Sequence, residues 1–145
     1  MDFDTPCFES LTGIGMITVS GFIAEVGDIR RFDNAKQLQK LAGYAIVANE
    51  SGKHKGESRI SYRGRKRLRY VLYEAAISVI GKNEEFREVH NYYRTREKNP
   101  LKKMQSVVAV ACKVLRIFYT ILTKGVDYDG TRLLNDIKRP HMQAA

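Results

Sequence analysis

The sequence contains few cysteines and histidines and has no long uninterrupted apolar run. Its only cysteines, Cys7 and Cys112, lie far apart and outside any C-x-x-C spacing, so we expect neither a zinc site nor a structural disulfide. The three histidines are scattered, and no metal-ligand cluster is predicted. Apolar runs such as residues 107–112 are far shorter than the roughly 20 residues of a membrane span. Asp2 and Asp4 are unlike the basic start of a signal peptide, so we expect a cytoplasmic protein without a membrane partner.

Acidic residues are scarce relative to basic ones. The chain of 145 residues has 16 Asp and Glu against 25 Lys and Arg, a formal charge of +9 and a pI near 9.7. A hydrophobic content of 43% is ordinary for a globular protein, and the length suits one domain with one core. The charge balance favours nucleic acid as a partner, ahead of an anionic membrane surface.

The positive charge is concentrated between Lys53 and Tyr70. This stretch has eight basic residues and one Glu, which leaves a net +7 of the whole chain's +9. A basic run of this density indicates a phosphate-rich partner. The residues that we expect to bind nucleic acid here are Lys53, Lys55, Arg59, Arg63, Arg65, Lys66, Arg67 and Arg69.

Much of this basic run begins a predicted helix over about residues 63–80. Apolar residues recur there at i, i+3 and i+4 spacing from Leu68 to Ile80. Cations in the first turns oppose the helix macrodipole by a few tenths of a kcal/mol each, so helix stability does not explain them. A bound polyanion would explain them, whereas the alternative is a solvated face of a small protein-interaction domain.

A second candidate for phosphate binding is the turn that contains Gly13 and Gly15. A short helix, a G-x-G turn and a helix ending at Gly27 would form a helix-hairpin-helix, whose turn amides can hold a DNA phosphate. The same pattern also fits a plain corner between two antiparallel helices, and the glycines alone do not decide between the two.

We predict an all-α fold of about six helices. It comprises the helix-hairpin-helix, then a small helical bundle with two long core helices, residues 63–80 and 102–124. A short irregular or hairpin-like insert is expected between Tyr44 and Tyr62. The predicted domain covers residues 10–128, with a linker at residues 1–9 and a tail at residues 129–145.

Three serines near the basic run are candidate nucleophiles: Ser51, Ser58 and Ser61. A serine among arginines suits attack on phosphorus, because guanidinium groups stabilise charge on the non-bridging oxygens. Ordinary loop hydroxyls fit the same positions, and Ser61 would also suit the N-cap of the following helix. The carboxylates share no spacing typical of a two-metal nuclease, so we assign no metal site or cofactor to this chain.

A series of blocks resembles one known family. The blocks are G-I-G at 13–15, E-x-G-D at 25–28, F-x-x-A-K-Q-L at 32–38, A-G at 42–43, S-G at 51–52, I-S-x-R-G-x-x-x-L-R at 60–69 and V-A-V-A-x-K-x-L-R at 108–116. In this order they are similar to the C-terminal transposase domain of the insertion-sequence 110/116/902 family. The likeness covers about residues 10–128.

The resemblance implies a DNA recombinase built from two parts. An N-terminal nuclease-like domain with acidic residues would bind a divalent metal such as Mg²⁺. The C-terminal domain would carry a serine that becomes linked to DNA, which falls on Ser51, with Ser58 and Ser61 as alternatives. A structured guide RNA, a homo-oligomeric assembly and a bacterial, nucleoid-associated location are also implied. The acidic domain is not found in these residues, so we expect this chain alone to bind nucleic acid without completing strand exchange.

Two functions are therefore predicted from the sequence. The first is a DNA-binding, serine-bearing recombination domain of a transposase. The second is a non-catalytic module that holds nucleic-acid backbone through the helix-hairpin-helix and the basic helix.

Overall fold

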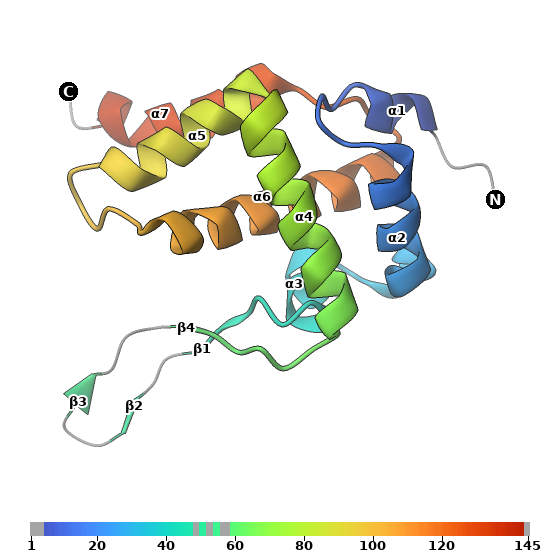
Figure 1. The fold of residues 1–145 in the computed structure, drawn as a ribbon, viewed down its shortest axis with the longest axis horizontal. Helices are drawn as coiled ribbons and strands as arrows, with labels where there is room; N and C mark the ends of the chain where they lie inside the picture. Colours follow the sequence, from blue (N-terminus) through green and yellow to red (C-terminus); the bar gives the residue numbers. More distant parts are fainter. Residues whose placement is uncertain (1–4, 48–49, 52–53, 56–58, 144–145) are drawn as a thin grey trace.

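A computed structural model describes residues 5–47, 50–51, 54–55 and 59–143, and these residues are mostly helical (Figure 1). The α-helices are α1 Thr5–Glu9, α2 Met16–Val26, α3 Ala35–Leu41, α4 Lys66–Lys82, α5 Glu84–Thr95, α6 Lys103–Lys124 and α7 Gly130–Gln143, with a 3₁₀ helix, η1, at Ile29–Arg31. The all-α prediction is confirmed, with seven α-helices in the described residues where about six were expected. Helix α4 begins at Lys66, three residues later than predicted.

Helix α6 is the centre of the core. Its buried side chains are Ser106, Val107, Val110, Ala111, Val114, Leu115, Phe118 and Ile121. Helix α4 crosses α6 and packs on it, and the buried apolar stripe of α4 includes Leu68 and Leu72. The two long core helices therefore pack together, as predicted. Each carries an apolar stripe that can be buried only against another element.

Helix α6 is also long and apolar enough, by length and composition, to cross a membrane. It is the one such helix among the described residues, although the sequence led us to expect no run of this kind. Its apolar residues line the buried core of the helical body, and the core helix of a globular protein has the same composition.

The first and last helices that the structure describes, α1 and α7, belong to the packed body. Phe8 of α1 is buried, and its ring lies edge-on to Phe118, with 5.2 Å between the ring centroids. Helix α7 packs along α5 and buries Leu133 and Ile137. We expected a linker over residues 1–9 and a tail over 129–145; residues 5–9 and 130–143 instead form helices that contribute to the core.

The insert between α3 and α4 contains two antiparallel strand pairs. Strand β1, Ile46–Val47, pairs with β4, Arg59–Ile60, while β2, Glu50–Ser51, pairs with β3, His54–Lys55. The outer pair, β2 and β3, lies away from the helices (Figure 1). Of the two forms expected for the insert, irregular or hairpin-like, its described parts fit the hairpin-like one.

A buried polar contact joins α5 to α6. The Nδ1 atom of His90 lies 2.7 Å from the Ser106 hydroxyl, and both residues are buried. Burial lowers the pKa of His90 below its usual 6.5, and the positive charges of Arg94 and Lys103 act in the same direction. The fold therefore holds this imidazole in its neutral form.

We expect His90 to make the protein less stable as the pH falls. Because its pKa is lower in the folded state, the unfolded chain binds the extra proton first, and stability is lost as the pH falls below about 6.5. His90→Gln should lower the free energy of unfolding by about 1 kcal/mol at neutral pH, since the contact with Ser106 is weakened. The variant should also flatten the decrease in stability between about pH 7.5 and pH 5. Urea unfolding of both proteins across this range tests this, and parallel pH profiles would contradict it.

Candidate nucleic-acid interface

The candidate interface is organised around residues 61–65, which lead into α4. Backbone hydrogen bonds join this segment to the end of α3: the Tyr62 amide donates to the Gly43 carbonyl at 3.1 Å, and the Arg65 amide donates to the Leu41 carbonyl at 2.8 Å. A side chain on Gly64 would collide with the Leu41 carbonyl and the Gly43 amide, so glycine is needed for this close approach. We call this contact of residues 61–65 with Leu41 and Gly43 the joint. It fixes the position of the basic start of α4 relative to α3.

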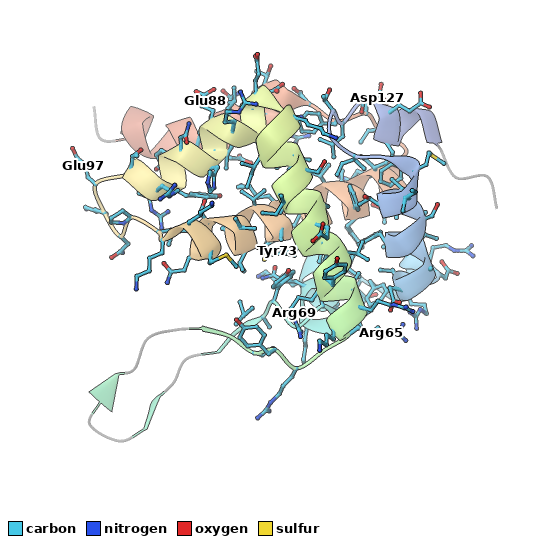
Figure 2. All side chains as sticks on the ribbon, in the orientation of Figure 1. Arg65, Arg69, Tyr73, Glu88, Glu97 and Asp127 are labelled. Atoms are coloured by element: carbon cyan, nitrogen blue, oxygen red, sulfur yellow. The ribbon has the colours of Figure 1, made fainter. Side chains whose placement is uncertain are left out.

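Two of the predicted nucleic-acid-binding arginines are bound within the protein. Arg65 Nη1 donates to the Glu25 carbonyl at 2.7 Å and lies 3.6 Å from Glu25 Oε2. The Arg69 guanidinium lies over the Tyr62 ring, 5.3 Å from its centroid, and Nη1 reaches the Ala42 carbonyl at 3.4 Å. Both arginines lie at the lower end of α4, and Tyr73 follows one turn further along (Figure 2). Arg65 and Arg69 therefore connect α4 to α2 and α3.

The other basic side chains at this end of α4 point into solvent. We call Arg63, Lys66 and Arg67 the basic face. All three are exposed, and within the described part of the chain their side chains form no hydrogen bond or ion pair. The first turn of α4 holds no acidic residue, and its N-cap, Arg65, provides no side-chain cap. The basic face thus adds positive charge where the helix dipole is already positive.

Helix α3 carries two further exposed basic residues that the sequence analysis did not assign to the interface. Lys36 and Lys40 are exposed on α3, and Lys40 precedes Leu41, the acceptor for the Arg65 amide. Lys36 lies in the first turn of α3, where a cation opposes the helix dipole, and this signal could have identified it from the sequence.

The Gly13–Gly15 turn lies at the opposite end of α4 from the basic face. Gly13 has a φ of 101°, a conformation that favours glycine, and its carbonyl accepts the Ser78 hydroxyl at 2.6 Å. Asn83, which caps α5, also donates to the Thr12 carbonyl at 3.2 Å. The structure therefore separates two groups of residues that we expected to act on the same partner.

The candidate serines differ in what the structure says of them. Ser51 lies in β2, with its backbone paired to that of His54; Ser58 lies outside the described residues. The Ser61 hydroxyl accepts the Arg63 amide at 3.2 Å and donates to the Gly43 carbonyl at 3.4 Å. Ser61 is not the N-cap of α4, because the helix starts after Arg65. Its hydroxyl instead supports the joint with α3.

The remaining predicted residues lie in the insert. Lys55 and Arg59 are described by backbone pairing alone, and Lys53 lies outside the described residues. Among the residues that the structure describes, no group of three or more His, Cys, Asp or Glu side chains could hold a metal ion.

Residues 5–91 match the Transposase IS116/IS110/IS902 family, which is more than half of the chain. The chain belongs to this transposase family. The resemblance seen in the sequence blocks is thereby confirmed, and the matched span contains the Gly13–Gly15 turn, the insert and the basic face.

Individual relatives agree with this assignment. The chain is 28% identical over 132 residues to a pilin gene-inverting protein of Moraxella lacunata, covering 89% of this chain and 40% of the relative. A pilin gene-inverting protein of Moraxella bovis is 30% identical over 83% of the chain and 37% of its own length. The transposase for insertion sequence element IS1111A of Coxiella burnetii is 29% identical over 83% of the chain and 33% of its length. The chain spans about a third to two fifths of the length of these relatives.

The family match ends within α5, yet the transposase fold depends on residues beyond it. Helix α4 packs more extensively on α6 than on any other helix, and it buries Leu68, Leu72 and Val79. Loss of α6 would expose part of this apolar stripe, at a cost of about 1.5–3 kcal/mol for each large side chain that became fully exposed. The residues matched by the family therefore do not contain the whole core that supports α4.

We expect Gly64→Ala to destabilise the domain by about 2 kcal/mol or more, because the new methyl group collides with the backbone of α3. Gly81→Ala is the matched control, since Gly81 lies in the last turn of α4 and a Cβ there meets nothing within 4 Å. This control should be neutral or stabilising by up to about 1 kcal/mol. Urea unfolding measures both changes. A loss of stability no greater for Gly64→Ala than for Gly81→Ala would contradict the close joint.

Proposed function

We propose that this chain is the DNA-binding part of a longer transposase and that its basic face binds the DNA backbone. The observation that carries the proposal is the set of three exposed cations, Arg63, Lys66 and Arg67, at the positive end of α4. Membership of a transposase family supports DNA as the partner.

Energetic considerations favour a bound polyanion over a solvated charged face. Each cation at a helix N-terminus costs a few tenths of a kcal/mol, and no acidic partner among the described residues offsets it for the basic face. The phosphates of DNA would offset this repulsion and release condensed counterions at the same time. Such contacts position a protein on the duplex without reading its sequence.

The two arginines that are bound within the protein, Arg65 and Arg69, support this proposal by positioning α4. Arg65 and Arg69 are held by backbone carbonyls, so they keep α4 attached to α2 and α3. Because α4 is attached to α2 and α3 in this way, the backbone that carries the basic face keeps its position when DNA binds. Less ordering is then needed on binding, which favours affinity.

The double variant Lys66→Ala with Arg67→Ala should bind duplex DNA more weakly than the unmodified chain. The slope of log K against log salt should become shallower by about 0.9 for each lost phosphate contact, so by nearly two in total. Lys124→Ala, which removes an exposed cation at the end of α6, should leave the slope unchanged. Fluorescence anisotropy over a salt series measures this; equal slopes for all three proteins would contradict the proposal.

We also propose Ser51 as the nucleophile of the longer recombinase. In this step the Ser51 Oγ attacks a DNA phosphorus, a serine–phosphate bond forms, the P–O bond to one DNA strand breaks, and the proton leaves with the released hydroxyl. The support is the position of Ser51 in the S-G block and in β2, beside the basic run. Acidic residues of another part of the full-length protein would hold Mg²⁺, and a homo-oligomer with a structured guide RNA would form the assembly.

Ser51→Ala in a full-length protein carrying these residues should abolish a covalent protein–DNA adduct on a denaturing gel. DNA binding by the basic face should persist, because the substitution removes no cation that binds phosphate. Ser58→Ala should leave the adduct intact, and Ser61→Ala should reduce stability through its lost hydrogen bonds. An adduct that survives Ser51→Ala would contradict this assignment.

A second candidate function is a non-catalytic backbone-binding module. The observation that favours it is the start of α2, where Gly15 is the N-cap without a side-chain cap, so the first amides of the helix have no side-chain acceptor. A DNA phosphate could accept from these amides in the manner of a helix-hairpin-helix. The adduct experiment on Ser51 distinguishes this function from recombination.

A further inference from the structure

Tyr62 is an exposed aromatic residue inside the basic segment. Tyr62 is 62% exposed as a residue, and it directly precedes Arg63 of the basic face. By contrast, Tyr44 on the other side of the same joint is buried, and its hydroxyl donates to the Arg69 carbonyl at 3.0 Å. A role in the core therefore explains why an aromatic residue stands at position 44, but it does not explain the one at position 62.

The backbone of Tyr62 is held in a costly conformation. Its φ of 54° is positive, and among the described non-glycine residues only Asn99 shares this feature. Bulky side chains adopt such angles rarely, and residues held in them cluster at functional sites. The Tyr62 amide donates to the Gly43 carbonyl at 3.1 Å, and the Tyr62 carbonyl accepts from Arg69 Nη1 at 3.5 Å. Both hydrogen bonds hold the ring at one position on the surface.

The ring is supported from one side only. The Arg69 guanidinium carbon lies 5.3 Å from the ring centroid, within the range of a cation–π contact. Gly43 is required for this arrangement, because a Cβ there would lie 2.6 Å from Arg69 Nη1 and 3.3 Å from the Tyr62 carbonyl carbon. Arg69 lies over one face, Tyr62 is 62% exposed as a residue, and the described residues place no ring or cation over the other face.

We propose that Tyr62, backed by Arg69, is a stacking site for one unpaired nucleobase beside the basic face. This inference rests on the proposed nucleic-acid binding and adds a preference for single-stranded segments. Aromatic rings next to basic side chains bind unpaired bases by stacking, while the cations hold the sugar–phosphate backbone. Bases inside a duplex already stack on each other, so they cannot use the ring. Arg69 is a positioning residue that holds the ring without contacting the base.

The test measures binding of the chain to single-stranded oligonucleotides of about 12 residues and to a duplex of the same length. Tyr62→Asn should weaken single-strand binding roughly tenfold, because one stacked base is lost, and should leave duplex binding nearly unchanged. Asparagine tolerates a positive φ, so this variant keeps the backbone of the joint. Tyr62→Phe retains the ring and should bind like the unmodified chain.

Tyr70 offers a matched control, since it is 63% exposed on α4 and the structure describes no arginine over its ring. Tyr70→Asn should change the ratio of single-strand to duplex affinity less than twofold. Oligothymidylate and oligouridylate distinguish DNA from RNA as the source of the base, and stacking on either one supports the site.

Two results would overturn the inference, and they differ from failure of the proposed function. An unchanged affinity ratio in Tyr62→Asn, or an equal effect of Tyr70→Asn, would remove the stacking site while salt-dependent duplex binding remained. A chain that bound neither duplex nor single strand would instead remove the proposed function, and the stacking site with it.

Discussion

The close backbone contact between Gly64 and the end of α3 is the constraint on which the functional surface depends. The Leu41 carbonyl lies where any larger residue at position 64 would place its Cβ, and it also accepts the Arg65 amide. The backbone between the insert and α4 is therefore held in one position against the end of α3. Arg63 lies before this contact and Lys66 after it, so both emerge on the surface around the same joint.

The core tolerates the repulsion that this arrangement creates. Each cation in the first turn of α4 costs a few tenths of a kcal/mol, whereas burying Leu68 or Leu72 stabilises the fold by about 1.5–3 kcal/mol. Burial of the apolar side of α4 thus outweighs the unfavourable charge at its start. The basic face can be selected for a partner, because the fold does not depend on it.

The contact with the end of α3 also gives neighbouring arginines of the basic run different roles. Arg65 and Arg69 contact carbonyls and a tyrosine ring, so both guanidinium groups have partners within the protein, although Arg65 remains exposed. Arg67 faces solvent on the same helix. The difference comes from the geometry of the joint, since all three residues are chemically alike. It also orients Tyr62, whose positive φ depends on Gly43 and Arg69 from two other elements.

The sequence by itself determined the long helices, the hairpin-like insert and the family, because apolar periodicity and ordered motif blocks are local properties of the chain. It also located the excess of positive charge. The contribution of α1 and α7 to the core was not evident, since a few buried residues such as Phe8 and Ile137 give too weak a pattern outside their tertiary contacts. Only the tertiary structure decided which cations are free, that Ser61 supports a joint, and that Gly13 and the basic face lie at opposite ends of α4. These outcomes depend on contacts between residues far apart in the chain, such as Arg65 with Glu25, which local sequence patterns do not encode.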